Sequence, residues 1–371
     1  MRKRSRKSML APARRKRGGR RARQRGYAIS VRGSAAMMPV NRAEEGPLLE
    51  AARQAGLLAG ACAMPEEAEV LLHESQLQRT FADWCAAHVK KRPDIQAMLR
   101  LSRSYTSGYA QGSGRKDNRI PLPLAGSAAA VVCASNEEDT LGKVLQQLER
   151  LPLREVIVVL NGCRDQSYPV ARKHRIASLL HFPDRLGHDV GRSVGAAMTS
   201  ADTVLFTDGD VAISAEELAP FIYKVDEGVD AALNDLNPYL PLFAQQDEVT
   251  RCKSFLNTVL GHPELGANSL TAVPHALAGH LIADIGIGQL MVPPKAQALA
   301  LAKGYRFALV KPVDVITANR KRPGNTGAGN AVADLIIGDH AEALHALLGT
   351  GWTPPSSAGS RVEVALRRNA R

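Results

Sequence analysis

The sequence has few aromatic residues, few cysteines and no long apolar run. Of its 371 residues, 4% are aromatic, and its five cysteines include no Cys-x-x-Cys pair. An odd number of widely spaced cysteines argues against a disulfide framework and against structural zinc, and it suits a reducing compartment. No stretch reaches the roughly 18 consecutive apolar residues that a membrane-spanning helix needs. We therefore expect a cytoplasmic protein.

Acidic residues are absent from the first 25 positions, which hold thirteen Lys or Arg. The remaining positions hold 35 basic and 36 acidic residues, so the net charge of +12 belongs to this leader. A run of like charge this dense is expected to be disordered and to attract anionic polymers or membrane surfaces weakly. No apolar segment of the secretory type follows it. The sequence predicts a disordered basic leader over residues 1–41, with an anionic-polymer or membrane-surface contact through residues 1–25.

Beyond the leader, the hydrophobic pattern predicts a helical extension followed by an α/β domain. Apolar residues at helical spacing over 42–100 predict two or three helices that end near Pro93. Ser, Gly and Pro are frequent over 101–126, which predicts a linker. From residue 128 strands and helices alternate, which is typical of a parallel sheet. The predicted boundaries are a helical extension and linker at 42–126, an α/β domain at 127–350 and a C-terminal tail at 351–371.

The predicted strands of the α/β domain end in polar residues. Strands are predicted at 128–134, 155–160, 181–182, 203–207, 230–233 and 306–310, with later helices at 247–260 and 295–303. Turn-forming residues follow three of these strands: Ser135-Asn136-Glu137, Asn161-Gly162 and Asp208-Gly209-Asp210. A loop from Gly187 to Arg192 precedes a further predicted helix. Because the carboxyl ends of parallel strands meet at one edge, we expect these residues to line one crevice.

Asp208 and Asp210 are the most informative pair in the chain. Carboxylate oxygens are the ligands that Mg²⁺ and Mn²⁺ prefer, and such cations often share ligands with substrate phosphates. The alternative is an ordinary turn, in which Gly209 supplies the backbone freedom and both aspartates are solvated. The other strand ends favour the metal-site interpretation.

The order and spacing of these segments resemble the family 2 nucleotide-sugar glycosyltransferases, which have the GT-A fold. The counterparts of that family's motifs are Asn136-Glu137, Leu160 to Asp165, Gly187 to Gly195 and Asp208-Gly209-Asp210. The resemblance covers about residues 127–320 and leaves the helical extension outside it. It implies an α/β fold with a mainly parallel sheet flanked by helices, to which the helical extension is added.

The resemblance also implies a function and a set of site residues. The implied reaction moves a sugar from a nucleotide-diphosphate sugar to an unidentified hydroxyl acceptor, with Mg²⁺ or Mn²⁺ as cofactor. The cation would lie on Asp208 and Asp210, and a distal histidine of this fold often joins it; His340, after the strand-like run 334–337, is the candidate. Contacts with the donor would come from Ser135, Asn136, Glu137, Asn161, Gly187, Arg192 and Asp208, with Arg192 meeting the diphosphate.

Two departures from the family pattern leave the chemistry open. Leu160 stands where many members carry an aspartate that recognises the base. Pro293 and Pro294 stand where inverting members place an acidic pair that serves as general base. Three hypotheses follow: the base lies elsewhere, the reaction retains configuration, or the protein binds a sugar nucleotide without efficient transfer. The candidate bases are Asp284, His275 and Glu264.

Other interpretations remain at the level of the sequence. The segment 265–276 is rich in small and hydroxyl residues and is the predicted acceptor wall. Residues 320–322 form a basic cluster beside a Gly-rich loop at 324–330. A sugar nucleotidyltransferase is a rival function, although such enzymes usually carry a basic Gly-rich loop where this chain has Ser135-Asn136-Glu137. The second rival is a degenerate sugar-nucleotide-binding protein that the leader recruits to anionic polymers.

Overall fold

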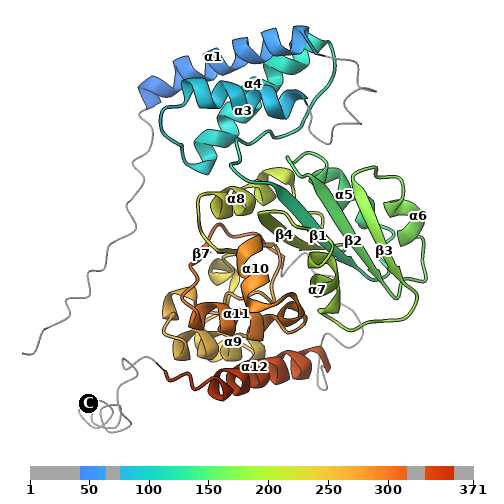
Figure 1. Ribbon diagram of the computed structural model, residues 1–371, viewed down its shortest axis with the longest axis vertical. Helices are drawn as coiled ribbons and strands as arrows, with labels where there is room; N and C mark the ends of the chain where they lie inside the picture. The colour runs from blue at the N-terminus through green and yellow to red at the C-terminus, as the bar shows by residue number, and fades with distance from the viewer. Residues whose placement is uncertain (1–41, 64–75, 316–330, 355–371) are drawn as a thin grey trace, which may run out of the picture. The chain divides into compact units, whose positions relative to one another are not determined.

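The structure is a computed structural model that describes residues 42–63, 76–315 and 331–354 (Figure 1). All of these residues belong to one compact unit, residues 39–371. The predictions for the basic leader, for the basic cluster at 320–322 with its loop, and for most of the C-terminal tail lie outside the described residues. None of the described helices is long and apolar enough to cross a membrane.

Among the described residues, seven strands form one sheet in the order β3-β2-β1-β4-β6-β5-β7. The strands are β1 (Ala128–Ala134), β2 (Glu155–Asn161), β3 (Ala177–Phe182), β4 (Thr203–Asp208), β5 (Ala231–Leu233), β6 (His275–Ala278) and β7 (Phe307–Leu309). All pairings are parallel except those of β6 with β4 and β5. The predicted α/β fold with a mainly parallel sheet is therefore confirmed, and β6 is a strand that the sequence did not predict.

The central strands β1, β2 and β4 are almost wholly buried, which explains their continuous apolar runs. The first helices of the domain are α5 (Leu141–Leu148), α6 (Ser167–Ala171), α7 (Val190–Ala196) and α8 (Ala215–Asp226). Helix α7 packs against β1 and β2, while α8 packs against β4, β5 and β6. A Cβ atom at Gly195 would collide with Val131, so glycine lets α7 lie directly on the sheet. This close approach brings the loop before α7 to the strand ends.

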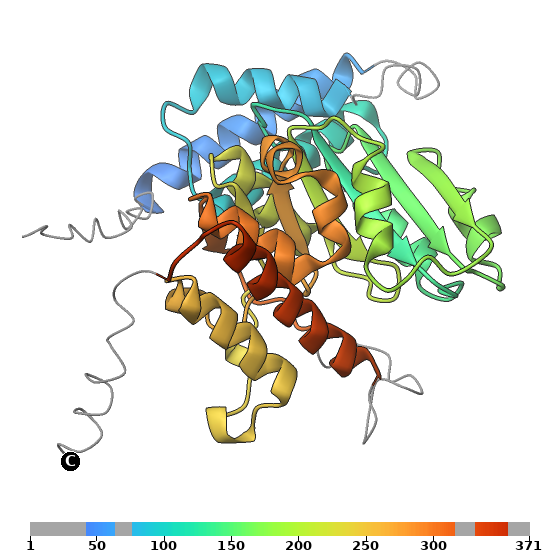
Figure 2. The ribbon, with the colours of Figure 1, turned by 60° about the horizontal axis from the view of Figure 1, so that its bottom comes forward.

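The second half of the domain adds a layer of helices. Its elements are η1 (Asn237–Tyr239), η2 (Phe243–Gln245), α9 (Glu248–Val259), η3 (Pro263–Leu265), α10 (Gly279–Ile285), η4 (Ile287–Met291), α11 (Pro293–Ala302) and α12 (Ala331–Gly349). Helix α12 lies beside α9 (Figure 2) and also packs on α11. Leu256, Leu301 and Leu347 belong to the apolar cluster that joins these three helices. The strand-like interpretation of 334–337 is wrong, because a short apolar run fits a helix face equally well.

The helical extension consists of α1 (Arg42–Ala61), α3 (Gln76–His88) and α4 (Ile95–Ser113). The predicted linker is wrong as far as Ser113, because these residues belong to α4. Glycines explain the error: Gly56 and Gly60 of α1 face Gly108 and Gly112 of α4, and a Cβ atom at any of the four would collide with backbone of the facing helix. The frequent glycines suggested a flexible linker, whereas in the structure the glycines of α4 allow it to pack closely against α1.

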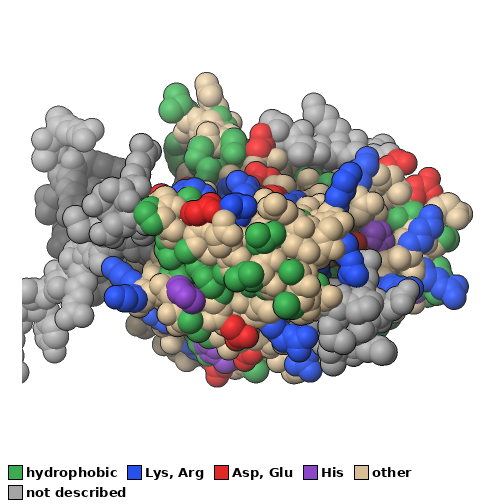
Figure 3. All heavy atoms as spheres, turned by 90° about the horizontal axis from the view of Figure 1, so that it is seen from above, with side chains coloured by type: hydrophobic (Ala, Val, Ile, Leu, Met, Phe, Trp, Pro, Cys, Tyr) green, Lys and Arg blue, Asp and Glu red, His purple; other side chains and the backbone are tan. Residues whose placement is uncertain are grey.

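Specific contacts fix the extension to the α/β domain. The Arg92 guanidinium lies 2.7 Å from the Asp226 carboxylate and stacks over the ring of Tyr223 at 4.0 Å. The Tyr223 hydroxyl donates to the Pro93 carbonyl at 2.9 Å. Seen from the side of Figure 3, apolar, acidic and basic side chains are interspersed on the surface. The extension is thus an ordered part of the compact unit, although the sequence pattern placed it outside the α/β domain.

Candidate active site at the carboxyl edge of the sheet

A pocket of about 120 Å³ lies at the carboxyl ends of β1, β2 and β4. It is lined by Cys133, Ala134, Ser135, Glu137, Asn161, His188, Asp189, Arg192, Asp208 and Asp210. Six of these residues belong to the site that the sequence predicts, and they come from three strand ends and the first turn of α7. The strand register accounts for the convergence, because Cys133 of β1 pairs with Asp208 of β4 and Ala134 pairs with Leu160 of β2.

Two of the predicted donor-binding residues shape the loops of the pocket. Asn136 has a φ of 62°, and its side-chain oxygen accepts a hydrogen bond from the Arg164 amide at 2.8 Å. The amide of Asn161 donates to the Gly187 carbonyl at 2.8 Å and accepts from the Leu186 amide at 2.7 Å. Asn161 still lines the pocket, whereas Asn136 and Gly187 do not. These contacts hold the turn after β1 and the loop after β3 in place.

The pocket concentrates carboxylates. Burial raises the pKa of Asp208 to about 6; Arg192 opposes this rise, while the nearby carboxylates of Asp210 and Asp189 add to it. Placing the negative charges of Asp208, Asp210 and Asp189 close together in a partly buried pocket is unfavourable unless a cation compensates them. An ordinary solvated turn would not impose this cost on Asp208.

The donor set fits a hard divalent cation that is shared with a ligand. Asp208 and Asp210 offer carboxylate oxygens, the atoms that Mg²⁺ and Mn²⁺ prefer. In the described ranges no group of three His, Cys, Asp or Glu side chains could hold a metal ion by itself. Mg²⁺ usually keeps waters and binds through one or two carboxylates plus substrate phosphates, so two protein ligands are compatible with such a site.

Arg192 lines the pocket, but its guanidinium has partners other than the one expected. It donates to the carbonyls of Leu270 at 2.7 Å and Thr271 at 3.3 Å, and it lies 3.2 Å from the Asp189 carboxylate. Burial opposes the charged form, but Asp189 and Asp208 outweigh it and raise the pKa of Arg192. The side chain is 6% exposed. Its position suits a role behind the carboxylates better than a direct contact with a diphosphate.

The structure does not bring the candidate bases into this pocket. Asp284, on α10, is exposed and forms an ion pair with Lys303 at 2.8 Å. Because β6 runs antiparallel to β4, the helix that follows it starts at the amino edge of the sheet, opposite to Asp208. Glu264 is exposed as well, 2.9 Å from His262. Neither carboxylate lines the pocket.

The two candidate histidines are buried away from the pocket lining. His275 stacks on Phe206 with ring centroids 5.1 Å apart, and its Nδ1 donates to the Ala272 carbonyl at 2.8 Å. Burial, with help from the Arg192 charge, lowers the pKa of His275 to about 3, so it is a poor base at neutral pH. His340 is 4% exposed in α12, with Nδ1 2.6 Å from the Ile336 carbonyl. The structure therefore does not place His340 with Asp208 and Asp210 as a metal ligand.

Two titratable residues near the pocket, Lys253 and Asp339, were missed by the sequence analysis, and His188 and Asp189 were named only as part of a loop. Burial lowers the pKa of Lys253, on α9, to about 8. Burial, followed by the charges of Asp189 and Glu342, raises the pKa of Asp339, on α12, to about 6. Asp189 and His188 stand in the loop that was expected to line the crevice, and both line the pocket. The other two come from helices whose place beside the strand ends no local pattern reveals.

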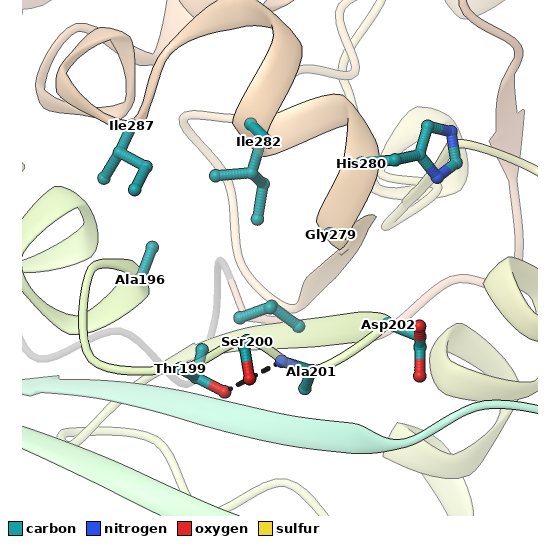
Figure 4. Close-up of a pocket in the computed structure, with 11 residues that line it drawn as sticks. Ala196, Thr199, Ser200, Ala201, Asp202, Gly279, His280, Ile282 and Ile287 are labelled. Atoms are coloured by element: carbon teal, nitrogen blue, oxygen red, sulfur yellow. Dashed lines mark hydrogen bonds between the residues drawn. The ribbon is translucent and has the colours of Figure 1, made fainter.

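A larger pocket of about 390 Å³ lies at the opposite edge of the sheet (Figure 4). Ala196, Ala201, Gly279 and Ile282 line it, and the Ala201 amide donates to Thr199 Oγ1 at 3.2 Å. Its lining is mostly apolar, and its one carboxylate, Asp202, already accepts hydrogen bonds from Ser127. Size alone would favour this pocket, but the chemistry favours the smaller one.

Comparison with known proteins supports the same segment. Residues 129–239 match the model of glycosyl transferase family 2. No curated protein matches the chain significantly. The similar solved structures include glucosyl-3-phosphoglycerate synthase from Mycobacterium tuberculosis in complex with Mn²⁺, UDP and glucosyl-3-phosphoglycerate (18% identity, TM-score 0.44, 62% of this chain and 82% of that chain). Another is the same enzyme with Mn²⁺, UDP and phosphoglyceric acid (18%, 0.46, 72% and 86%).

The matched segment runs from the first residues of β1 to the turn after β5. It therefore contains the strand ends, the loop before α7, and both Asp208 and Asp210. The resemblance to the family 2 glycosyltransferases that the motifs indicate is confirmed for residues 129–239.

Proposed function

We propose that the protein transfers a sugar from a nucleotide-diphosphate sugar to a hydroxyl acceptor, with Mg²⁺ or Mn²⁺ on the diphosphate. The observation that carries this proposal is the half-buried carboxylate pair Asp208 and Asp210, which lines the pocket at the carboxyl edge of the sheet inside the segment that matches the family. Ser135, Glu137 and Asn161 line the same pocket from β1 and β2, on the side where we place the nucleoside.

Each group has a chemical task in this proposal. Asp208 and Asp210 hold the cation, which when bound neutralises the charge that develops on the departing nucleoside diphosphate. The loop that Asn161 holds closes the nucleoside side of the pocket. Asp189 and Arg192 lie behind the carboxylate pair and fix the local charge balance.

As the general base that takes the proton from the acceptor hydroxyl, we assign Asp339 rather than Asp284 or His275. Asp339 is half-buried on α12 and does not itself line the pocket, but unlike Asp284 and Glu264 its carboxylate interacts electrostatically with Asp189 and His188, which do. A carboxylate whose pKa is raised to about 6 is a better proton acceptor near neutral pH than an ordinary aspartate. This assignment makes the reaction inverting, since a base on the protein activates the incoming hydroxyl.

The test is nucleotide binding followed by turnover. UDP, GDP, CDP, dTDP and ADP are added with Mn²⁺ or with EDTA, and the melting temperature is measured. We expect one nucleotide to raise it only with Mn²⁺, since a ligand bound by the native state stabilises that state. Asp210→Asn should abolish this shift, whereas Asp202→Asn, the same change at the opposite edge, should leave it intact. No metal-dependent shift with any nucleotide would contradict the proposal.

One observation favours a second candidate, a sugar-nucleotide-binding protein without efficient transfer. Pro293 and Pro294 begin α11 and are both buried, so the helix start where the family pattern expects an acidic pair offers no proton acceptor. The two functions are separated by incubating the protein with sugar nucleotides that carry the nucleobase identified in the melting experiment. Transfer of the sugar to an acceptor with release of the nucleoside diphosphate, slowed in Asp339→Asn, supports the transferase. Metal-dependent binding without any turnover supports the binding protein.

A further inference from the structure

A buried polar network begins at Arg192, which lines the pocket together with the carboxylate pair and interacts electrostatically with Asp208. From α7, its guanidinium donates to the carbonyls of Leu270 and Thr271 and contacts Asp189. Arg192 is 6% and Asp189 8% exposed. The Arg192 guanidinium, whose charge acts on Asp208, is thus hydrogen-bonded to Leu270, which lies 78 residues farther along the sequence.

The same segment is held from its other side by two amide side chains. The Leu270 amide donates to Gln297 Oε1 of α11 at 2.9 Å, so the peptide groups of this residue are fixed at both ends. Gln297 Nε2 in turn donates to Asn257 Oδ1 of α9 at 2.7 Å. Gln297 and Asn257 are each 1% exposed. A chain of hydrogen bonds therefore connects α9 and α11 to Arg192.

Asn257 and Asn268 complete the network around the predicted acceptor wall. Asn257 Nδ2 donates to the carbonyls of Gly266 at 2.9 Å and Asn268 at 3.0 Å. Asn268, fully buried, accepts from the Leu236 amide at 2.8 Å and donates to the Leu265 carbonyl at 2.9 Å. The conformation of residues 265–271 is thereby specified by side chains from three helices and by the segment itself.

Stability alone does not account for this arrangement. Burying a guanidinium and three amides costs desolvation, and apolar side chains of similar shape often stabilise a core at least as well. Satisfied polar networks instead specify one geometry, because any displacement leaves a buried donor or acceptor unpaired. Here the geometry that is specified is that of the one guanidinium lining the pocket beside Asp208.

Resting on the proposed function, we propose that this network positions the Arg192 guanidinium behind Asp208, and that Gln297 and Asn257 act on nucleotide binding only through Arg192. Arg192 is then a positioning residue and not a ligand of the diphosphate. Gln297 lies outside the pocket lining, so any effect of its replacement on nucleotide affinity must travel through the network.

A double-mutant cycle tests the proposal. The variants are Gln297→Met, which keeps the shape and removes the side-chain hydrogen bonds to Leu270, Asn257 and Asn268, then Arg192→Met, and the double variant. The probe is Mn²⁺ with whichever of UDP, GDP, CDP, dTDP or ADP the wild type binds, and the dissociation constant is measured by calorimetry at 15 °C. We expect each single variant to weaken binding at least tenfold. The double variant should lie within twofold of Arg192→Met, because residues of one network are not additive.

The control separates positioning from general loss of stability. Leu99→Ala makes a cavity in α4, where Leu99 is 5% exposed, and should lower the melting temperature while leaving the dissociation constant within twofold. Asn257→Leu serves as the second variant if Gln297→Met does not fold. Unchanged affinity in the network variants, or additive losses in the pair, would overturn the inference while the proposed function stands. A wild type that binds no nucleotide would overturn both.

Discussion

The crowding of carboxylates at the strand ends predicts that removing one charge stabilises the protein. In the folded state the pKa of Asp208 is raised from 3.8 to about 6, so its ionised form is less favourable there than in the unfolded chain. At about 1.4 kcal/mol for each pH unit, the penalty at pH 8 is about 3 kcal/mol. Because the folded pKa is the higher one, stability is regained as the pH falls from 6 towards 4. Asp208→Asn should therefore be more stable than the wild type by about 3 kcal/mol at pH 8 and by less than about 1 kcal/mol at pH 4.

Differential scanning calorimetry in EDTA measures this difference. For a chain of this length, unfolding entropy scales so that 3 kcal/mol corresponds to about 4 °C in melting temperature. We expect Asp208→Asn to melt about 4 °C above the wild type at pH 8 and within about 1 °C of it at pH 4. With Mn²⁺ and the bound nucleotide the order should reverse, since only the wild type gains the binding free energy.

A matched substitution gives the opposite sign. Hydrogen bonds from Ser127 lower the pKa of Asp202, so its ionised form favours the folded state above pH 4. Asp202→Asn should therefore lower the melting temperature at pH 8. If Asp208→Asn is as stable as the wild type or less stable at pH 8 in EDTA, the carboxylate does not bear a burial cost and the reasoning is refuted.

Three further predictions follow from other parts of the structure. Gly108→Ala should push α1 and α4 apart and cost about 1–3 kcal/mol in urea unfolding, whereas Gly46→Ala, where a Cβ meets nothing within 4 Å, should be neutral or slightly stabilising. Arg92→Ala should lower the free energy of unfolding by about 2 kcal/mol, because it leaves the 4% exposed carboxylate of Asp226 without its cation. The double variant that adds Asp226→Asn should regain part of this loss, because the uncompensated charge is gone. Asp339→Asn should lower the rate of sugar transfer at least about 100-fold with unchanged nucleotide affinity; an unchanged rate would remove it as the base.

The central strands β1, β2 and β4 were predictable because burial on both faces of a strand five or more residues long leaves a local signature, whereas the four buried residues of β6 were too few to be recognised. β1 begins and ends where the apolar run predicts, and β2 and β4 each extend one residue farther, since the residue that ends each strand is the first polar one. The turn residues after them follow from the same pattern. In this part of the chain the strand ends carry both the fold and the site, so one signal predicts both.

Pairwise packing, in contrast, leaves no local signature. The glycines of α4 resemble a linker until α1 is placed against them, since it is Arg53 and Leu57 of the other helix that leave no room for a side chain. Asp339 is equally hidden, because its electrostatic neighbours Asp189 and Glu342 include one that lies 150 positions away. Sequence reasoning searched for the base near the family's usual position and reached Asp284, on the wrong edge of the sheet.

The sequence left Asp208-Gly209-Asp210 open between a metal site and a solvated turn, and the partners around the pocket favour the metal site that we propose. Behind the carboxylates, the Arg192 guanidinium and the amides of Gln297 and Asn257 have hydrogen-bond partners. In front, burial and two neighbouring carboxylates make the charge on Asp208 unfavourable. A solvated turn needs neither the ordered network nor the crowded charge. A cation-binding edge fits both, because the network fixes the Arg192 guanidinium near Asp208 and a bound cation would relieve the crowding of the carboxylates at neutral pH.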